Sequence, residues 1–344
     1  MLRPSLLSFF PAILAVAFAA ACGDNSATSV DAGVDADVPP DGGEMIEEVT
    51  CATLPPVASG TCEVTAGSDS KLVKGIVLTP TKVFRGGQVA VNPAGQITCV
   101  GCECATGGET VISCPDGVVS PGLINTHDHI TFTQNDPYTD SGIRYEHRHQ
   151  WRIGQDGKPK IPSAGSASAD AVRWGELRFL MGGATSIVGS GGQAGLLRNL
   201  DRATLMEGLT KKAVDFDTFP LGDTGGTRRT TDCNYGTATT VADLANVDAY
   251  EPHTSEGIDT SARNEFLCQS SVTYDTMTPG VSNNLLLNKT AMIHAIGLTP
   301  ADLASMAAAG TSLIWSPRSN ITLYGDTERV TTAARAGVEI ALGT

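Results

Sequence analysis

Basic residues are scarce in this sequence. Its 344 residues include 23 Lys and Arg against 37 Asp and Glu, for a formal net charge of −14 at pH 7. No basic patch of the kind that neutralises nucleic-acid phosphates is present, so we expect no nucleic-acid partner. Residues 23–50 contain eight acidic residues and no Lys or Arg. A segment of this composition cannot bury enough apolar surface to fold, so residues 22–50 are predicted to be an acidic, disordered linker.

The sequence also lacks an apolar run long enough for a comfortable transmembrane helix. Residues 6–21 form a short apolar run after the single charge of Arg3, a pattern typical of a targeting segment. Residues 19–22, Ala-Ala-Ala-Cys, resemble the end of a bacterial lipoprotein signal, although the usual Leu three positions before the Cys is Ala. We therefore expect residues 1–21 to be a signal peptide and Cys22 to be acylated. The exported protein would then be tethered to a membrane surface, on the periplasmic side or at the cell surface. A plain secretory signal is the alternative.

Eight cysteines remain after Cys22. An even number in an exported chain favours disulfide bonds, but the sequence does not show which cysteines pair. Three of them form the pattern Cys99-x-x-Cys102-x-Cys104, for which a metal knuckle or a redox motif is the alternative. The eight are Cys51, Cys62, Cys99, Cys102, Cys104, Cys114, Cys233 and Cys268.

About 290 residues follow the linker, enough for a large α/β domain with a smaller companion. Within residues 51–117, branched apolar runs predict strands at 72–78, 88–91, 96–100 and 111–112, with a turn at 92–95. The sequence therefore predicts a small antiparallel sheet in front of the larger domain.

Residues 118–344 alternate between predicted helices and strands. This alternation implies a parallel sheet, and the number of units favours a (β/α)8 barrel, whose ligands gather at the carboxyl ends of the strands. Helices are predicted at 169–181, 200–212, 299–310 and 326–337. Buried strands are predicted from 118 towards His127 and at 184–188, 248–253, 290–295, 311–315 and 338–343.

Histidine side chains follow several of these strands. Alternate residues of a strand face the same way, so His127 and His129 can hold one divalent metal together. His253 and His294 also follow apolar or extended runs, and in a parallel barrel these ends meet at one rim. A single such histidine is more often a packed or solvent-facing residue. Four of the chain's six histidines at strand ends favour a metal site.

Two further motifs lie near these histidines. Glu256 follows His253 by three residues, which lets its carboxylate approach a metal held by His253 without binding it. The alternative is an acid at a helix N-terminus, which the helix dipole favours. A second His-x-His, at His147 and His149, lies in a long polar segment between arginines. Nearby cations disfavour a bound metal, so we interpret this motif as a loop or a wall of the substrate pocket.

Over residues 70–344, the order and spacing of these motifs resemble the amidohydrolase superfamily, in its cytosine-deaminase, chlorohydrolase and imidazolonepropionase-like branch. The matching pieces lie at 121–129 (PGLINTHDH), 253–257 (HTSEG), 293–295 (IHA), 316–320 (SPRSN) and 341–344 (ALGT). The resemblance implies an α/β fold with a distorted, TIM-like (β/α)8 barrel over residues 118–344. It also implies a small β-sandwich built from segments on both sides of the barrel, of which residues 51–117 would be the first.

The resemblance also implies roles for the site residues. His127, His129 and His253 would bind the metal, Glu256 would shuttle protons, and His294 would orient or polarise the attacked group and the water. One ion is implied, zinc or else iron, because the Lys that binuclear members carry on the fourth strand has no counterpart here.

The implied reaction is metal-assisted hydrolysis of a non-peptide C–N bond in a small molecule, by deamination of a ring amidine or opening of a cyclic amide. Dechlorinating hydrolysis is chemically close. A catalytically inactive surface lipoprotein that only binds a ligand is an alternative of a different class. Position alone suggests that Arg318, Asn320 and residues 144–151 shape the substrate pocket. The sequence indicates neither the substrate nor an oligomeric state.

The end of the chain departs from the family pattern. The family's last strand continues Gly-Thr-Asp, in which the Asp is a metal ligand and proton acceptor, whereas this sequence ends at Thr344. The final barrel helix and the second β-sandwich segment are missing as well. We therefore expect a C-terminally truncated chain that is inactive by itself. A naturally short, inactive protein is the alternative.

The lipoprotein signal leads to the first testable prediction. Radiolabelled palmitate should enter the protein when it is expressed in a bacterium, because Cys22 would be the acylated N-terminal residue. The substitution Cys22→Ser should abolish the label. Labelling that survives in the mutant would show that Cys22 is not the site of acylation.

Overall fold

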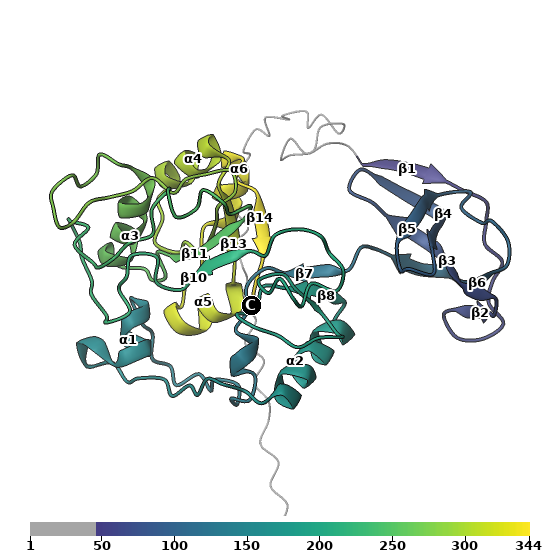
Figure 1. The fold of residues 1–344 in the computed structure, drawn as a ribbon, viewed down its shortest axis with the longest axis horizontal. Helices are drawn as coiled ribbons and strands as arrows, with labels where there is room; N and C mark the ends of the chain where they lie inside the picture. The colour runs from purple at the N-terminus through teal and green to yellow at the C-terminus, as the bar shows by residue number, and fades with distance from the viewer. Residues whose placement is uncertain (1–45) are drawn as a thin grey trace, which may run out of the picture. The chain divides into compact units, whose positions relative to one another are not determined.

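The computed structural model describes residues 46–344. The predicted signal peptide, Cys22 and most of the predicted linker lie outside the described residues. Within residues 46–344, no helix combines the length and the apolar character needed to cross a membrane. The first described residues form a β-sheet, and the remainder alternates between strands and helices (Figure 1).

The first part of the described chain is one mixed sheet of six strands. The spatial order is β1-β4-β3-β6-β2, and β5 also pairs with β4. β1 runs parallel to β4 and β3 runs parallel to β6, while the other pairs are antiparallel. The strands are β1 (Glu47–Thr50), β2 (Glu63–Thr65), β3 (Ser68–Leu78), β4 (Lys82–Val91), β5 (Ile97–Gly101) and β6 (Glu109–Val119).

This sheet confirms the predicted β content and corrects several details. The sheet is mixed rather than antiparallel, because β1 with β4 and β3 with β6 pair in parallel. β1 lies inside the range assigned to the linker, so the sheet begins before residue 51. Val118 and Val119 end β6 instead of beginning the strand that leads to His127. Pro121 separates the two strands, since proline has no backbone N–H to continue a ladder.

The turn at 92–95 forms as predicted, through one side chain. Asn92 Oδ1 accepts hydrogen bonds from the backbone N–H groups of Ala94 at 3.0 Å and Gln96 at 2.9 Å. An asparagine that binds its own backbone in this way mimics a tight turn and so fixes the hairpin between β4 and β5. In this sheet, Leu72 of β3 and Ala90 of β4 are buried together with Cys104.

Four disulfides pair all eight cysteines of the described residues. The disulfide prediction is therefore confirmed, and the alternative metal knuckle is not formed because its three thiols are already used. Cross-links of this kind stabilise small exported folds mainly by restricting the unfolded chain. The pairs are Cys51–Cys102, Cys62–Cys114, Cys99–Cys104 and Cys233–Cys268.

The second part contains two parallel sheets whose strands follow the chain order. The first holds β7 (Leu123–Asn125), β8 (Ala184–Ile187) and β9 (Arg198–Asn199). The second holds β10 (Asp215–Asp217), β11 (Tyr250–Thr254), β12 (Ala291–His294), β13 (Ser312–Trp315) and β14 (Ile340–Leu342). The predicted mixed α/β class with parallel strands is confirmed.

Regular ladder pairing does not close these sheets into a barrel. At one seam, a backbone hydrogen bond runs from Val214 N–H to the Leu200 carbonyl at 2.8 Å. At the other, Thr126 N–H donates to the Leu342 carbonyl at 3.0 Å. β7 is an edge strand paired regularly only with β8, and its Leu123 and Ile124 are more than half exposed. The prediction of a buried strand before His127 is therefore wrong.

The helices agree with the sequence where their caps are strong. α4 begins with a complete capping box, in which Thr299 and Asp302 each bind the other's backbone N–H, and it ends at Gly310 in the left-handed region. α2 matches its predicted bounds, with Ser168 as the N-cap. The helices are α1 (Arg148–Ile153), α2 (Ala169–Met181), α3 (Thr260–Ser270), α4 (Pro300–Ala309), α5 (Pro317–Tyr324) and α6 (Val330–Ala336), with short 3-10 turns at η1 (Ile130–Phe132) and η2 (Gln155–Gly157).

Two helix predictions are wrong. Residues 200–212 form successive turns, because the Asp201 carboxylate binds the backbone N–H groups of Gly189 and Gly191 and so holds this segment to the loop after β8. Asp326 does not cap a helix: α5 ends just before it, and α6 begins only at Val330. α1, α3 and α5 were not predicted, although Asp259 caps α3 and Pro317 begins α5.

The main core lies between the five-stranded sheet and the helices α3, α4 and α6, which Figure 1 shows beside it. Burying a Phe, Leu or Met side chain in this core stabilises the fold by roughly 1.5–3 kcal/mol. Its buried members include Phe266, Met292, Leu303, Met306, Leu313 and Ala333.

The disulfide pattern can be tested by peptide mapping. We expect the alkylated, unreduced protein to yield cross-linked peptides for all four pairs and almost no alkylated thiol, because every described cysteine is paired. The same protein alkylated after reduction is the control. If Cys99, Cys102 and Cys104 were all alkylated before reduction, the pairing would be wrong and the metal-knuckle alternative would return.

Candidate metal centre

Four histidine rings meet at the carboxyl ends of β7, β11 and β12. The Nε2 atoms of His127 and His253 lie 3.1 Å apart. The His127 ring centre is 5.2 Å from that of His129 and 5.1 Å from that of His294. One ligand atom each from His127, His253 and His294 all lie within 4.8 Å of one another. The structure therefore brings all four predicted histidines together.

Burial favours the neutral form of three of these rings, those of His127, His129 and His253. His127 and His253 are buried, and desolvation together with the neighbouring imidazoles holds the pKa of each well below its usual value. Desolvation also lowers the pKa of His129. A neutral imidazole offers a lone pair, which is the form that binds a metal.

Hydrogen bonds orient the rings by their other nitrogen. His253 Nδ1 lies 3.3 Å from the backbone carbonyl of Asp217, to which it can only donate. His294 Nδ1 lies 2.9 Å from Asn320 Oδ1. The amide of Asn320 is itself fixed, because its nitrogen donates to Glu328 at 2.8 Å. Both rings are therefore oriented through Nδ1, which directs Nε2 into the site, as hydrogen-bond partners do for histidines that bind a metal.

One helix supplies several of these partners. Ser316, just before α5, lies 3.0 Å from His127 Nδ1, and Asn320 binds His294. Tyr324, at the end of α5, donates from its hydroxyl to Glu256 Oε1 at 2.8 Å. These three residues are spaced by four, so they lie along one face of the helix. α5 was not predicted, although this spacing is visible in the sequence.

Glu256 is held in one orientation beside His294. Its Oε2 lies 3.7 Å from His294 Nε2, while Oε1 accepts from Tyr324. Trp151 Nε1–H donates to the same tyrosine oxygen at 2.8 Å, which leaves the hydroxyl proton for Glu256. Burial, with the nearby Glu256 carboxylate, raises the pKa of Tyr324 well above its usual value, so this donor stays protonated.

The backbone around these residues is strained. Ser255, His294 and Ala295 adopt φ values of 54°, 70° and 52°, in the left-handed region. Ala295 N–H donates to the Thr254 carbonyl at 3.0 Å, and the next amide donates to the Ser255 carbonyl at 3.1 Å. Strained non-glycine residues persist only where the surroundings determine them, and they cluster at functional sites.

The donor set suits one divalent ion. Two imidazole nitrogens 3.1 Å apart match the separation of two ligands that each lie about 2.0–2.1 Å from a tetrahedral zinc. A cavity of about 10 Å³ lies against His127, His129 and His253, which is room for about one ion or water. The residues present therefore fit a metal of the kind predicted.

A buried carboxyl group that sequence analysis missed lines the same cavity. Glu251 lies two residues before His253 on β11, so both side chains face the same side of the strand. Burial and the nearby Asp201 raise the pKa of Glu251 to about 8. Strand alternation counted back from His253 was the signal that could have found it.

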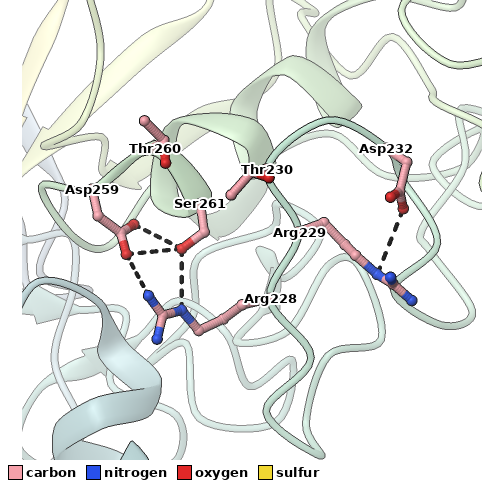
Figure 2. A pocket seen from close by; sticks show the side chains of 7 residues that line it. All are labelled: Arg228, Arg229, Thr230, Asp232, Asp259, Thr260 and Ser261. Carbon is pink, nitrogen blue, oxygen red and sulfur yellow. Dashed lines mark hydrogen bonds and ion pairs between the residues drawn. The ribbon is translucent and has the colours of Figure 1, made fainter. Parts of the chain in front are cut away.

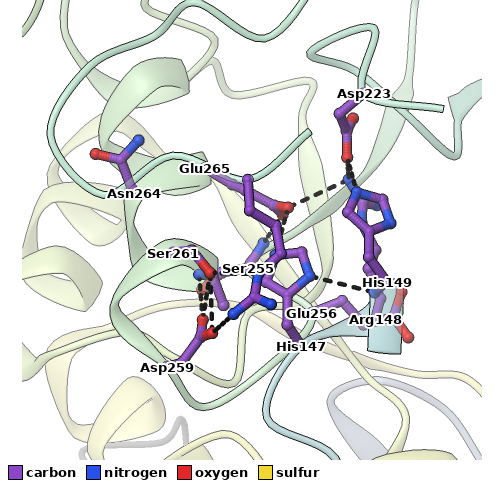
Figure 3. A network of polar contacts seen from close by, with 12 residues as sticks. His147, Arg148, His149, Asp223, Ser255, Glu256, Asp259, Ser261, Asn264 and Glu265 are labelled. Carbon is purple, nitrogen blue, oxygen red and sulfur yellow. Dashed lines mark hydrogen bonds and ion pairs between the residues drawn. The ribbon is translucent and has the colours of Figure 1, made fainter. Parts of the chain in front are cut away.

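The second His-x-His does not form a loop. His147 is the N-cap of α1, and His149 lies in its first turn; both side chains are fully buried. His149 Nε2 lies 2.8 Å from Asp223 Oδ2, and Arg148 Nη2 lies 2.6 Å from the same oxygen (Figure 3). Interpreting this motif as a loop or pocket wall is therefore wrong. The motif anchors a buried polar network.

The two predicted substrate-binding residues occupy different environments. Asn320 is buried and binds His294, as described above. Arg318 is exposed on α5 and makes no hydrogen bond within residues 46–344. Its contact with a substrate remains a prediction.

Two of the other hollows in the second part of the chain bear on a ligand. One, of about 620 Å³, is lined mainly by apolar and aromatic side chains, including Phe132, whose ring meets that of His129 edge-on at 6.0 Å. The other, of about 270 Å³, lies at the N-terminus of α3 (Figure 2). Its Arg228 already pairs with Asp259 at 2.6 Å and its Arg229 with Asp232 at 3.5 Å, so neither charge is available for an anion.

No family model matches this chain, and no curated protein matches it. Among solved structures, an adenosine deaminase from Xanthomonas campestris with bound zinc is 16% identical, with 80% of this chain and 68% of that chain covered and a TM-score of 0.46. Atrazine chlorohydrolase from Arthrobacter aurescens complexed with zinc is 15% identical, with 80% and 71% covered and a TM-score of 0.47. Guanine deaminase from C. acetobutylicum with bound guanine is 14% identical, with 80% and 74% covered and a TM-score of 0.47. With identities and TM-scores this low, no residue role in this chain follows from them.

Proposed function

We propose that this protein is a metal-dependent hydrolase that cleaves a non-peptide C–N bond in a small molecule. The observation that carries the proposal is the convergence of four buried imidazoles beside Glu256, whose carboxylate is held by Tyr324 and lies 3.7 Å from His294. The eight parallel strands would then form the distorted barrel that places these residues at one rim. The apolar start of the chain supports export and anchoring at a membrane surface.

We assign the metal to His127, His129 and His253. His127 and His253 share the closest nitrogen pair. The His129 ring makes no hydrogen bond to any part of residues 46–344, which leaves its nitrogens for an ion, and it lies 5.5 Å from the His253 ring. His294 instead faces Glu256, which suits a group that orients the water or the substrate.

The chain's own residues would move the protons. A zinc or iron ion bound there would polarise the substrate and lower the pKa of a water molecule from about 15.7 towards 7. Glu256 takes the proton from the attacking water and returns it to the leaving nitrogen, so the proton count balances. Tyr324 keeps the carboxylate aimed at the reacting atoms, and His294, donating to Asn320 from Nδ1, meets the reaction through Nε2.

The substrate would be a small cyclic amidine or amide. The hollow beside Phe132 supports an apolar portion of the substrate next to His129. Deamination and ring opening use the same water, the same base and the same metal, so the site supports both.

The first test separates metal binding from turnover in the full-length gene product. We expect about one zinc or iron per chain by elemental analysis, as in mononuclear catalytic sites. Glu256→Gln should keep the metal and lower kcat by about 10²–10⁴, because it removes the proton carrier. His127→Ala should lose both metal and activity. A wild-type protein without metal would point instead to an inactive ligand-binding lipoprotein.

The second test identifies the third ligand, using a matched pair of variants. We expect His129→Ala to lose metal and His294→Ala to retain it, because His294 Nε2 is directed at Glu256. His294→Ala should still be slow in turnover. The reverse pattern of metal contents would show that the compact trio of His127, His253 and His294 is the ligand set.

A further inference from the structure

The second His-x-His motif forms part of a buried cluster that lies behind Glu256. Glu265, in the middle of α3, is fully buried, and its carboxylate has two sets of donors. Oε1 lies 3.1 Å from His147 Nε2 and 3.4 Å from Arg148 Nη2, and Oε2 accepts the backbone N–H of Ser255 at 3.1 Å (Figure 3). One carboxylate thus joins α1 to the residue just before Glu256.

The same short segment of α1 holds the residues that follow. Arg148 N–H donates to the Glu256 carbonyl at 3.0 Å. Ile258 N–H donates to the Glu146 carbonyl at 2.8 Å, and His147 and Gly257 form a bridge. A side chain at Gly257 would clash with the Glu146 carbonyl oxygen, which shows how closely the two backbones approach. Residues 255–258 are therefore fixed along their length.

The Arg148 side chain extends this support to His253, a proposed metal ligand. Its guanidinium is buried, and Nη1 donates to the Thr218 carbonyl at 2.7 Å. The preceding residue, Asp217, is the one whose carbonyl orients His253. The cluster therefore binds the backbone of Ser255 and Glu256, where the proposed base lies. It also binds the backbone of Thr218, the residue after the carbonyl that orients His253. None of its side chains lines the metal cavity.

We propose that Glu265, together with His147, is a positioning residue that fixes the backbone of residues 255–258 and so places the Glu256 carboxylate for proton transfer. The inference rests on the proposed function, since it gives Glu256 a catalytic role. It also explains why a strongly polar cluster is buried here. Removing one partner of such a network leaves the others without compensation.

A glutamine in place of Glu265 would accept from only one of the two groups that donate to the carboxylate, His147 and Ser255 N–H. His147 Nδ1 accepts the His149 N–H at 3.2 Å, so its proton is on Nε2 and it donates to Glu265. Ser255 N–H donates as well. A carboxylate accepts from both sides, whereas a glutamine amide accepts through its oxygen and must turn its NH2 towards the other donor. The variant keeps the size of the side chain and loses one of the two links.

The main experiment uses Glu265→Gln in the full-length gene product. We expect metal content and KM to be unchanged and kcat to fall by about 10- to 100-fold, which is typical for a residue that orients a site from outside it. Asp302→Asn is the matched control. It alters another largely buried carboxylate that pairs with α3, through Arg263 at 2.8 Å, but touches nothing in residues 255–258. It should leave kcat unchanged.

A double substitution separates positioning from a general loss of structure. If Glu265 acts through Glu256, Glu265→Gln should cost nothing further in a Glu256→Gln background. An equal loss of kcat in both backgrounds, a loss matched by Asp302→Asn, or no loss at all would overturn the inference.

A readout without turnover keeps the inference distinct from the proposed function. Hydrogen exchange of a peptide covering residues 253–258 should speed up in Glu265→Gln and not in Asp302→Asn. Unchanged exchange would overturn the positioning role even in an active enzyme. Faster exchange in a protein that hydrolyses nothing would support the positioning of this segment and reject the proposed hydrolase.

Discussion

Imidazole rings sharing one buried space are the constraint on which this structure depends. A buried lone pair without a partner costs free energy, and the rings at β7, β11 and β12 direct theirs towards one another. The Nδ1 atoms of His127, His253 and His294 are already satisfied by Ser316, a backbone carbonyl and Asn320. A single cation could accept the remaining lone pairs of His127 and His253 together, whereas one hydrogen bond satisfies only one of them. The fold thus leaves a small buried space lined by nitrogen donors that suit one ion.

The orientation of the site depends on a second layer as much as on the strands. α5 presents Ser316, Asn320 and Tyr324 along one face, where they hold two histidines and Glu256. On the opposite side, α1 and α3 hold the backbone that carries Glu256. The Tyr324 hydroxyl therefore fixes the Glu256 carboxylate, while hydrogen bonds to Ser255 N–H and the Glu256 carbonyl fix the backbone that carries it. Geometry fixed from two directions is what a proton carrier needs, because transfer requires hydrogen-bond reach.

The sequence predicted the histidines and not their partners, for a physical reason. A histidine at the end of an apolar run is a local pattern, and strand alternation shows which way it faces. Tyr324 lies 68 positions from Glu256, and Glu265 meets His147 across 118 positions. Such contacts are decided by how helices pack, and α1 and α5 are too short for propensity to reveal them. Elements with strong caps, such as α4, were predictable because the cap lies within a few residues.

The two His-x-His motifs show that the environment decides what the same three-residue pattern does. The first motif follows β7: His127 Nε2 lies 3.1 Å from His253 Nε2, and the His129 ring centre lies 5.5 Å from that of His253. The second begins α1, where His147 uses one nitrogen to accept the His149 N–H and the other to reach Glu265. Both nitrogens of His149 also have partners: Nδ1 accepts from Arg152, and Nε2 lies against Asp223. With both nitrogens of each ring engaged, the second motif has no lone pair to offer a metal. Whether a histidine pair binds an ion or braces the fold therefore depends on the donors already supplied around it.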